Sequence, residues 1–191
     1  MHALSAAAAA VAAAVLLTAC GSSTKKPIAL PSASPTASPS PSVFSSPSPT
    51  ADPTADATKQ VLAAYNGMWA DEIKAYTTGT LNGVDLETYA GDKALANIRV
   101  TAIYYQNSNV VLRGQPVLSP QVTAIDLGSV PPRATIKDCV DSSHFVPVDK
   151  TSGQPAQTTD TNHRHVENAT ARIYNGHWVI MDSSIDRGQA C

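Results

Sequence analysis

Two groups of side chains in the C-terminal half carry the donor types that bind metals or activate a nucleophile. The first group is Asp141, His144 and Asp149, and the second is Asp160, His163 and His165. Neither spacing matches a defined zinc or calcium motif. Ser142-Ser143-His144 is not surrounded by a strained elbow or by glycines that would form an oxyanion hole. We therefore expect no metal, no cofactor and no nucleophilic triad.

The N-terminal cysteine, Cys20, lies in a context that favours lipid attachment. Residues 4–19 are apolar and uncharged, and the run is shorter than the ~20 residues of a membrane span. It ends in small residues, as a signal peptide does. Leu17-Thr18-Ala19-Cys20 resembles the bacterial lipobox, although no Lys or Arg precedes the run. We expect a signal peptide over residues 1–19 and lipid on Cys20; the alternative is an ordinary cleaved signal with an incidental cysteine.

The other two cysteines, Cys139 and Cys191, form an even pair in a chain expected to be exported. Exported proteins fold in oxidising compartments, where disulfides form and persist. We predict a Cys139–Cys191 disulfide that fastens the C-terminus to the middle of the domain. The alternative is two free thiols.

Residues 20–55 have the composition of a tether. Eight of the fourteen prolines lie between Pro27 and Pro53, among Ser, Thr and Ala. Proline removes backbone donors, and the segment has too little apolar surface to fold. We expect a disordered, lipid-anchored tether. The formal charge of the whole chain is −2, which is not the basic balance typical of nucleic-acid binding, so we expect no nucleic-acid partner.

A helix is predicted from Asp56, which can cap it. Apolar side chains recur at helical spacing at Leu62, Tyr65, Trp69, Ile73 and Tyr76. Charged residues are expected on the opposite, solvent face, namely Lys59, Asp71, Glu72 and Lys74. Gly79 is expected to end the helix.

The rest of the domain, residues 56–191, is predicted as a second helix followed by strands. The helix starts at Asp85, is interrupted at Gly91 and ends at residues 107–109. The predicted strands are 117–127, 134–141, 144–148, 166–174 and 178–185, and Asn175-Gly176 is a strong hairpin signal. Helices first and antiparallel strands after predict an α+β domain, with helices packed on one face of a curved sheet.

Several short motifs carry a family resemblance over about 130 residues. They are Tyr65 to Trp69 (YNGMW), 91–95 (GDKAL), 114–118 (GQPVL), 122–124 (VTA), 138–143 (DCVDSS), 178–180 (WVI) and the terminal Cys191. The chain resembles the nuclear-transport-factor-two-like (cystatin-like) cone fold, in the version found in exported lipoproteins of actinobacteria. The resemblance implies a cone with an internal pocket. It implies no single activity, because such folds host enzymes, ligand-binding domains and docking modules.

The pocket implied by the resemblance gives a set of candidate lining residues. They are Tyr65, Trp69, Tyr104, Asp138 and Trp178. The aromatic side chains at helical and strand spacing are also suited to an ordinary core. Cone-fold isomerases use a carboxylate base and a tyrosine hydroxyl, and here Asp138, Asp182, Tyr65 and Tyr104 supply those groups. A strand aspartate can equally face water or an arginine.

We expect a lipid-anchored protein on the outer face of the bacterial cytoplasmic membrane, held through Cys20. The expected activity is non-enzymatic: binding of a small apolar ligand, or docking of an envelope protein. One alternative is a small-molecule isomerase or dehydratase that uses an Asp/Tyr pocket. Another is a passive structural component of an envelope complex.

Overall fold

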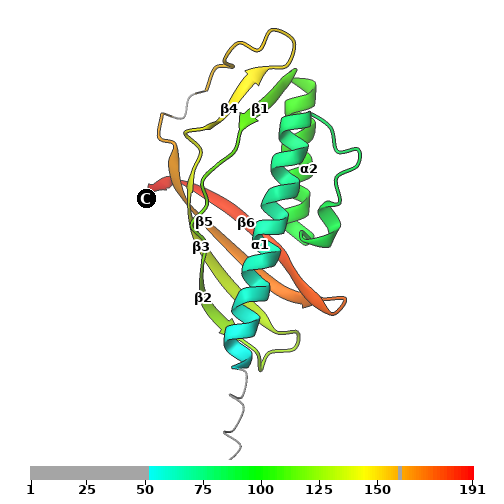
Figure 1. Ribbon diagram of the computed structural model, residues 1–191, viewed down its shortest axis with the longest axis vertical. Helices are drawn as coiled ribbons and strands as arrows, with labels where there is room; N and C mark the ends of the chain where they lie inside the picture. Colours follow the sequence, from blue (N-terminus) through cyan, green and yellow to red (C-terminus); the bar gives the residue numbers. More distant parts are fainter. Residues whose placement is uncertain (1–51, 159–160) are drawn as a thin grey trace, which may run out of the picture. The chain divides into compact units, whose positions relative to one another are not determined.

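The computed structural model describes residues 52–158 and 161–191 (Figure 1). The predicted signal peptide, Cys20 and nearly all of the predicted tether lie outside the described residues. The described part is an α+β domain with two α-helices, one short 3-10 helix and two antiparallel sheets. None of its helices is both long and apolar enough to cross a membrane.

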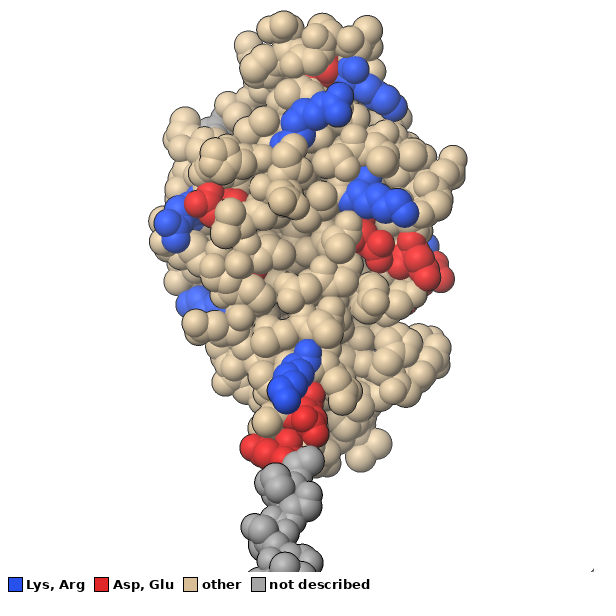
Figure 2. Space-filling model, in the orientation of Figure 1, with Lys and Arg blue, Asp and Glu red and all other residues tan. Residues whose placement is uncertain are grey.

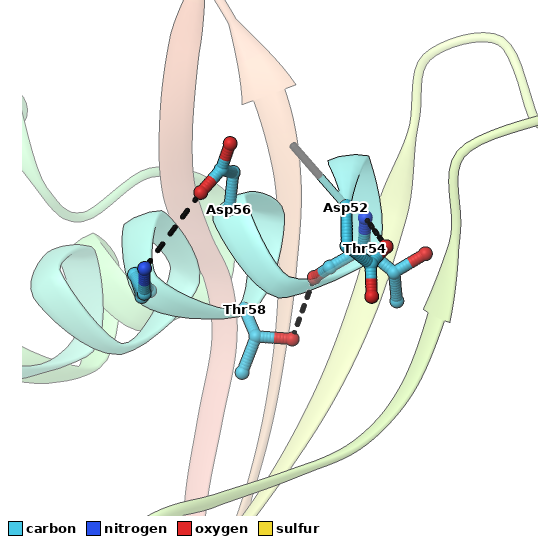
Figure 3. A network of polar contacts seen from close by, with 5 residues as sticks. Asp52, Thr54, Asp56 and Thr58 are labelled. Carbon is cyan, nitrogen blue, oxygen red and sulfur yellow. Dashed lines mark hydrogen bonds and ion pairs between the residues drawn. The ribbon is translucent and has the colours of Figure 1, made fainter. Parts of the chain in front are cut away.

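Helix α1 (Pro53–Thr78) begins earlier than the sequence predicts. Asp52 caps it, because its Oδ1 accepts a hydrogen bond of 2.9 Å from the backbone N–H of Thr54 (Figure 3). Pro53 occupies the first turn, where its missing N–H has no cost. Asp56, the predicted cap, instead lies in the first turn, with its Oδ1 3.8 Å from Nζ of Lys59. Residues 53–55, which the sequence analysis assigns to the tether, therefore form the first turn of α1.

The predicted helix end at Gly79 and the predicted interruption at Gly91 are confirmed. Gly79 ends the helix with a left-handed φ of 66°, which glycine adopts without steric cost. A short 3-10 helix, η1 (Leu86–Thr88), follows, and helix α2 (Asp92–Asn107) starts directly after Gly91. The backbone N–H of Gly91 donates to the carbonyl of Ile180, which ties the start of α2 to the sheet.

Six strands form the two sheets. Strand β1 (Val110–Gly114) pairs with β4 (Phe145–Asp149), and the larger sheet has the order β2 (Gln121–Asp126), β3 (Arg133–Asp141), β5 (Arg164–Tyr174), β6 (His177–Ala190). Strand β1 was not predicted, because it is only five residues long and follows α2 almost directly. The predicted strand 117–127 is shorter, since only Gln121–Asp126 pair with β3.

Strands β5 and β6 form the predicted hairpin. Asn175 and Gly176 have φ values of 49° and 84°, the pair of positive angles that a type I′ turn requires. Tyr174 faces His177 across the turn.

Both α-helices lie on the same side of the sheets, with α2 beside α1 (Figure 1). Their inward side chains and the facing strand residues make one core, in which Tyr65, Met68, Ile136 and Ile180 are fully buried. The predicted link between Cys139 and Cys191 is present, with the two Cα atoms 5.8 Å apart. The last residue of the chain is thereby fastened to β3.

Candidate functional site

A pocket of about 600 Å³ lies between the two α-helices, the β1–β4 pair and the β5–β6 hairpin. Its walls are mostly apolar or aromatic. They include Trp69 and Tyr76 from α1, Ile98 and Tyr105 from α2, and Leu112, Val140 and Phe145 from the strands. Its polar lining includes two carboxyl groups, those of Glu72 and Glu167. This size and composition are typical of a small-molecule site.

Glu167 of β5 is the most buried polar group of the lining, with 2% of its surface exposed. Its Oε2 accepts hydrogen bonds from the Tyr65 hydroxyl at 2.7 Å and from Nε1 of Trp69 at 3.2 Å. Its Oε1 accepts from the hydroxyl of Ser183 on β6. Three donors from α1 and β6 therefore fix this carboxyl at the inner end of the pocket.

Tyr65 connects Glu167 to a second buried carboxyl, that of Asp138 on β3. The Tyr65 hydroxyl lies 3.0 Å from Oδ2 of Asp138, and the backbone N–H of Ser119 donates to the other oxygen of Asp138 at 2.6 Å. A phenol carries one proton, so it donates to only one of two carboxyls. The remaining contact is a hydrogen bond only when one of the two carboxyls is protonated.

Burial of the two carboxyls favours the protonation of one of them. Removal from water is the largest cause that raises the pKa of Glu167 and that of Asp138 above their ordinary values. The hydrogen bonds from Ser183, Tyr65 and Ser119 oppose the rise. Burial likewise raises the pKa of the Tyr65 hydroxyl, followed in size by the nearby Glu167 carboxylate. Tyr65 therefore stays protonated and acts as a donor.

Glu72 lies one turn along α1 from Trp69, and its carboxyl faces the same pocket. Loss of hydration, and then the negative charge of Glu167, raise its pKa from 4.5 to about 8. A hydrogen bond with Tyr76 opposes the rise. At neutral pH the pocket thus holds a mostly neutral carboxylic acid at Glu72, which becomes a carboxylate just above that pH.

The five predicted lining residues differ in their position relative to the pocket. Trp69 lines the pocket, whereas Tyr65 is fully buried behind it and reaches it through Glu167. Asp138 is buried on the other side of Tyr65, against a smaller cavity of about 360 Å³ next to the disulfide. Trp178 is packed in the core and does not line the pocket.

The prediction for Tyr104 is wrong, since 64% of its surface is exposed. Its neighbour Tyr105 lines the pocket instead. Successive residues of an α-helix point about 100° apart, so an error of one position in the phase of α2 turns a side chain from pocket to solvent.

Of the other predicted chemical groups, His163 and His165 line the pocket. Asp182 is not among the lining residues, and its Oδ2 lies 3.4 Å from Nζ of Lys93. Asp141 and Asp149 accept hydrogen bonds from Ser143 and Ser152 in local turns. No group of three or more metal-ligating side chains is found within residues 52–158 and 161–191. Asp160 lies outside the described residues.

Sequence reasoning missed both carboxyls of the pocket. Glu72 was predicted on the solvent face of α1, yet it is three residues after Trp69 and four before Tyr76, on the face that the aromatics define. Glu167 shares its strand face with Ala169 and Ala171, both buried. A glutamate in phase with buried neighbours was the available signal in each case.

The molecular face seen in Figure 2 is largely uncharged. Lysine, arginine and acidic side chains stand there in small, separate groups. Within the described domain, Arg99 and Glu87 form an ion pair with a distance of 2.5 Å.

Comparison with known proteins gives little. No protein-family model matches the sequence, and no curated protein matches it. Among solved structures, the chain is similar to the crystal structure of the intermembrane space region of the chloroplast protein ARC6. That likeness has a TM-score of 0.45 and 11% identity, and covers 75% of this chain and 100% of the other. A likeness of this size carries no functional argument.

Proposed function

We propose that this protein is a cell-surface lipoprotein whose domain binds a small, mainly apolar molecule in the pocket between the helices and the sheets. The observation that carries the proposal is the cavity of about 600 Å³, whose apolar and aromatic walls are interspersed with polar side chains. Cavities of ~300–1,000 Å³ with such linings are typical ligand sites. The lipobox-like Leu17-Thr18-Ala19-Cys20 and the proline-rich segment after it support a lipid-anchored domain outside the cell.

We also infer that the domain is a cone-like member of the nuclear-transport-factor-two-like class. The order of elements supports this, with helices α1 and α2 first and a hydrogen-bonded antiparallel sheet after. The position of the pocket between the helices and the sheets also fits such a cone. An experimental structure superposed on solved members of that class tests the inference.

Acid–base catalysis is a second candidate function. The observation that favours it is the position of the Glu72 carboxyl in the wall of the pocket, where burial raises its pKa to about 8. A general acid or base works best when its pKa is near the operating pH. The Asp138 and Tyr65 pair of the original hypothesis is hydrogen-bonded but lies behind Glu167. In this form the hypothesis therefore rests on Glu72.

A fluorescent apolar probe tests the binding function. N-phenyl-1-naphthylamine is neutral at pH 7 and brightens in apolar sites. We expect saturable binding to the full-length protein. Thr101→Trp, which adds an indole to the pocket wall on α2, is expected to weaken it at least tenfold. Val100→Trp is the matched control, because Val100 is 67% exposed on the same helix.

Circular dichroism must show that both variants fold. Equal probe binding by Thr101→Trp and the wild type would place the probe elsewhere and overturn the pocket as the site. Absence of saturable binding by the wild type would overturn the apolar-ligand function itself.

The anchor has its own test. Incorporation of a palmitate label into the wild type, lost in Cys20→Ala and retained in Cys139→Ala, is the expected result. Label that persists in Cys20→Ala would contradict lipid attachment at Cys20.

A further inference from the structure

The carboxyl groups of Glu72 and Glu167 indicate which chemical class of ligand the pocket binds. This inference rests on the proposed binding function. We propose that the ligand carries an amine or quaternary ammonium cation, and that this charged end lies between Glu72 and Glu167 while its apolar body contacts the aromatic walls. The site would thus recognise an amphiphilic cation, not a neutral hydrocarbon.

The placement of the two carboxyls supports a cationic group. Both line the same cavity, one from α1 and one from β5, and they are close enough for Glu167 to affect the ionisation of Glu72. Glu167 is fixed by Tyr65, Trp69 and Ser183. When Glu72 is ionised, a cation between the two carboxylates would offset their mutual repulsion, which no neutral ligand can do.

Aromatic rings surround the same space. Trp69 donates its indole N–H to Glu167, so the edge of its ring points at that carboxyl. Tyr76, one turn from Glu72 on α1, and Tyr105 of α2 also line the cavity. Rings beside carboxylates are the combination that binds ammonium groups, with about 0.5–2 kcal/mol for each well-placed cation–π contact.

The lining also holds three basic side chains, those of His163, His165 and Arg187. His163 and Arg187 are exposed, whereas His165 is 5% and Glu167 2% exposed. The charges and titratable groups around Glu72 come from all the elements that enclose it: Tyr76 of α1, Tyr105 of α2, Glu167 and His165 of β5, His163 before β5, and Arg187 of β6. Among these, the two that set the pKa of Glu72, besides its own burial, are Glu167 and Tyr76.

Cation binding is therefore linked to pH. A bound cation favours the carboxylate form of Glu72, so binding below the pKa of about 8 releases a proton. With a permanently charged ligand, only the protein titrates. Affinity should then rise as pH rises and level off above pH 8.

The experiment compares two probes of nearly equal shape, phenyltrimethylammonium and tert-butylbenzene, as competitors of N-phenyl-1-naphthylamine on the full-length protein. We expect phenyltrimethylammonium to bind at least tenfold more tightly than tert-butylbenzene at pH 9. We expect its affinity to increase about tenfold or more between pH 6 and pH 9. Tert-butylbenzene should show no such increase.

Glu72→Gln keeps the size of the side chain and removes its charge. We expect this variant to bind phenyltrimethylammonium at least tenfold more weakly at pH 9, with most of the pH dependence lost, and to bind tert-butylbenzene within twofold of the wild type. Histidine titration is common to both proteins, so the difference between them reports on Glu72.

The outcomes separate the two claims. If tert-butylbenzene competes as well as phenyltrimethylammonium, or if Glu72→Gln binds the cation normally, the cation inference is overturned while the apolar pocket stands. If N-phenyl-1-naphthylamine shows no binding that Thr101→Trp weakens, the proposed function fails, and the inference fails with it.

Discussion

At the scale of single residues, the hydroxyl of Tyr65 is the contact that joins the two buried carboxyls. It lies 2.7 Å from Glu167 and 3.0 Å from Asp138. We expect Tyr65→Phe to lower the free energy of unfolding by about 2 kcal/mol, because it leaves buried carboxyl oxygens without a donor. Urea unfolding measures this. Tyr174→Phe, at an exposed position, should change stability by less than about 0.5 kcal/mol, and an equal effect of the two would contradict the proposed bridge.

Glu72 gives a second residue-scale prediction, on stability against pH. Its folded-state pKa of about 8 exceeds its ordinary value of 4.5, so folding favours the protonated form. The wild type keeps this contribution below pH 4.5 and loses it as pH rises to 8. Glu72→Gln stays neutral, so it should be as stable as the wild type at pH 4 and more stable at pH 9, by about 1–3 kcal/mol.

Chemical denaturation at the two pH values measures the difference. Glu87→Gln is the control, since Glu87 is an exposed partner of Arg99. A Glu72→Gln variant with the same pH profile as the wild type would show that Glu72 titrates normally.

At the scale of elements, two residues near the start of α1, Asp52 and Asp56, are candidates for its N-cap. Asp52 receives the Thr54 N–H, while Asp56 makes a long contact with the exposed Lys59 (Figure 3). We expect Asp52→Ala to destabilise the domain by about 1 kcal/mol, and Asp56→Ala by about 0.5 kcal/mol or less. Thermal unfolding compares the two. The reverse order would mean that the helix starts at Asp56, as the sequence pattern alone suggested.

The elements predicted correctly are those with strong local signals. Gly79, Gly91 and Asn175-Gly176 marked a helix end, a break and a hairpin, and the structure has all three. The start of α1 was misjudged because Pro53 belongs by composition to the preceding segment. Strand β1 was missed because its partner, β4, is more than thirty residues away, and a pairing over that distance leaves no local pattern.

The pocket was less predictable than the elements. Its aromatic residues were partly identified, but a charged residue in a helical or strand pattern is normally assigned to the solvent face, so Glu72 and Glu167 were passed over. Which side of α2 faces the pocket depends on its contacts with β1 and β6, which set the phase that exposes Tyr104 and leaves Tyr105 half-buried in the pocket wall. These contacts belong to the tertiary structure and leave no pattern in the local sequence.

At the scale of the whole molecule, the disulfide closes a loop of 52 residues from β3 to the C-terminus. The chain-entropy model gives it up to about 4 kcal/mol. We expect the double variant Cys139→Ser/Cys191→Ser to unfold at lower urea concentration by an amount within that limit, and the reduced wild type to behave likewise. If reduction leaves the urea midpoint of the wild type unchanged, the bond does not contribute to stability.

The central claim is that the pocket holds a small molecule, and native mass spectrometry of the full-length protein from its exporting host tests it most directly. We predict a mass above that of the chain, lost on denaturation and absent from Thr101→Trp, with the released compound carrying an amine or quaternary ammonium group. A native mass equal to the denatured mass, in the wild type as well as in Thr101→Trp, would contradict the claim.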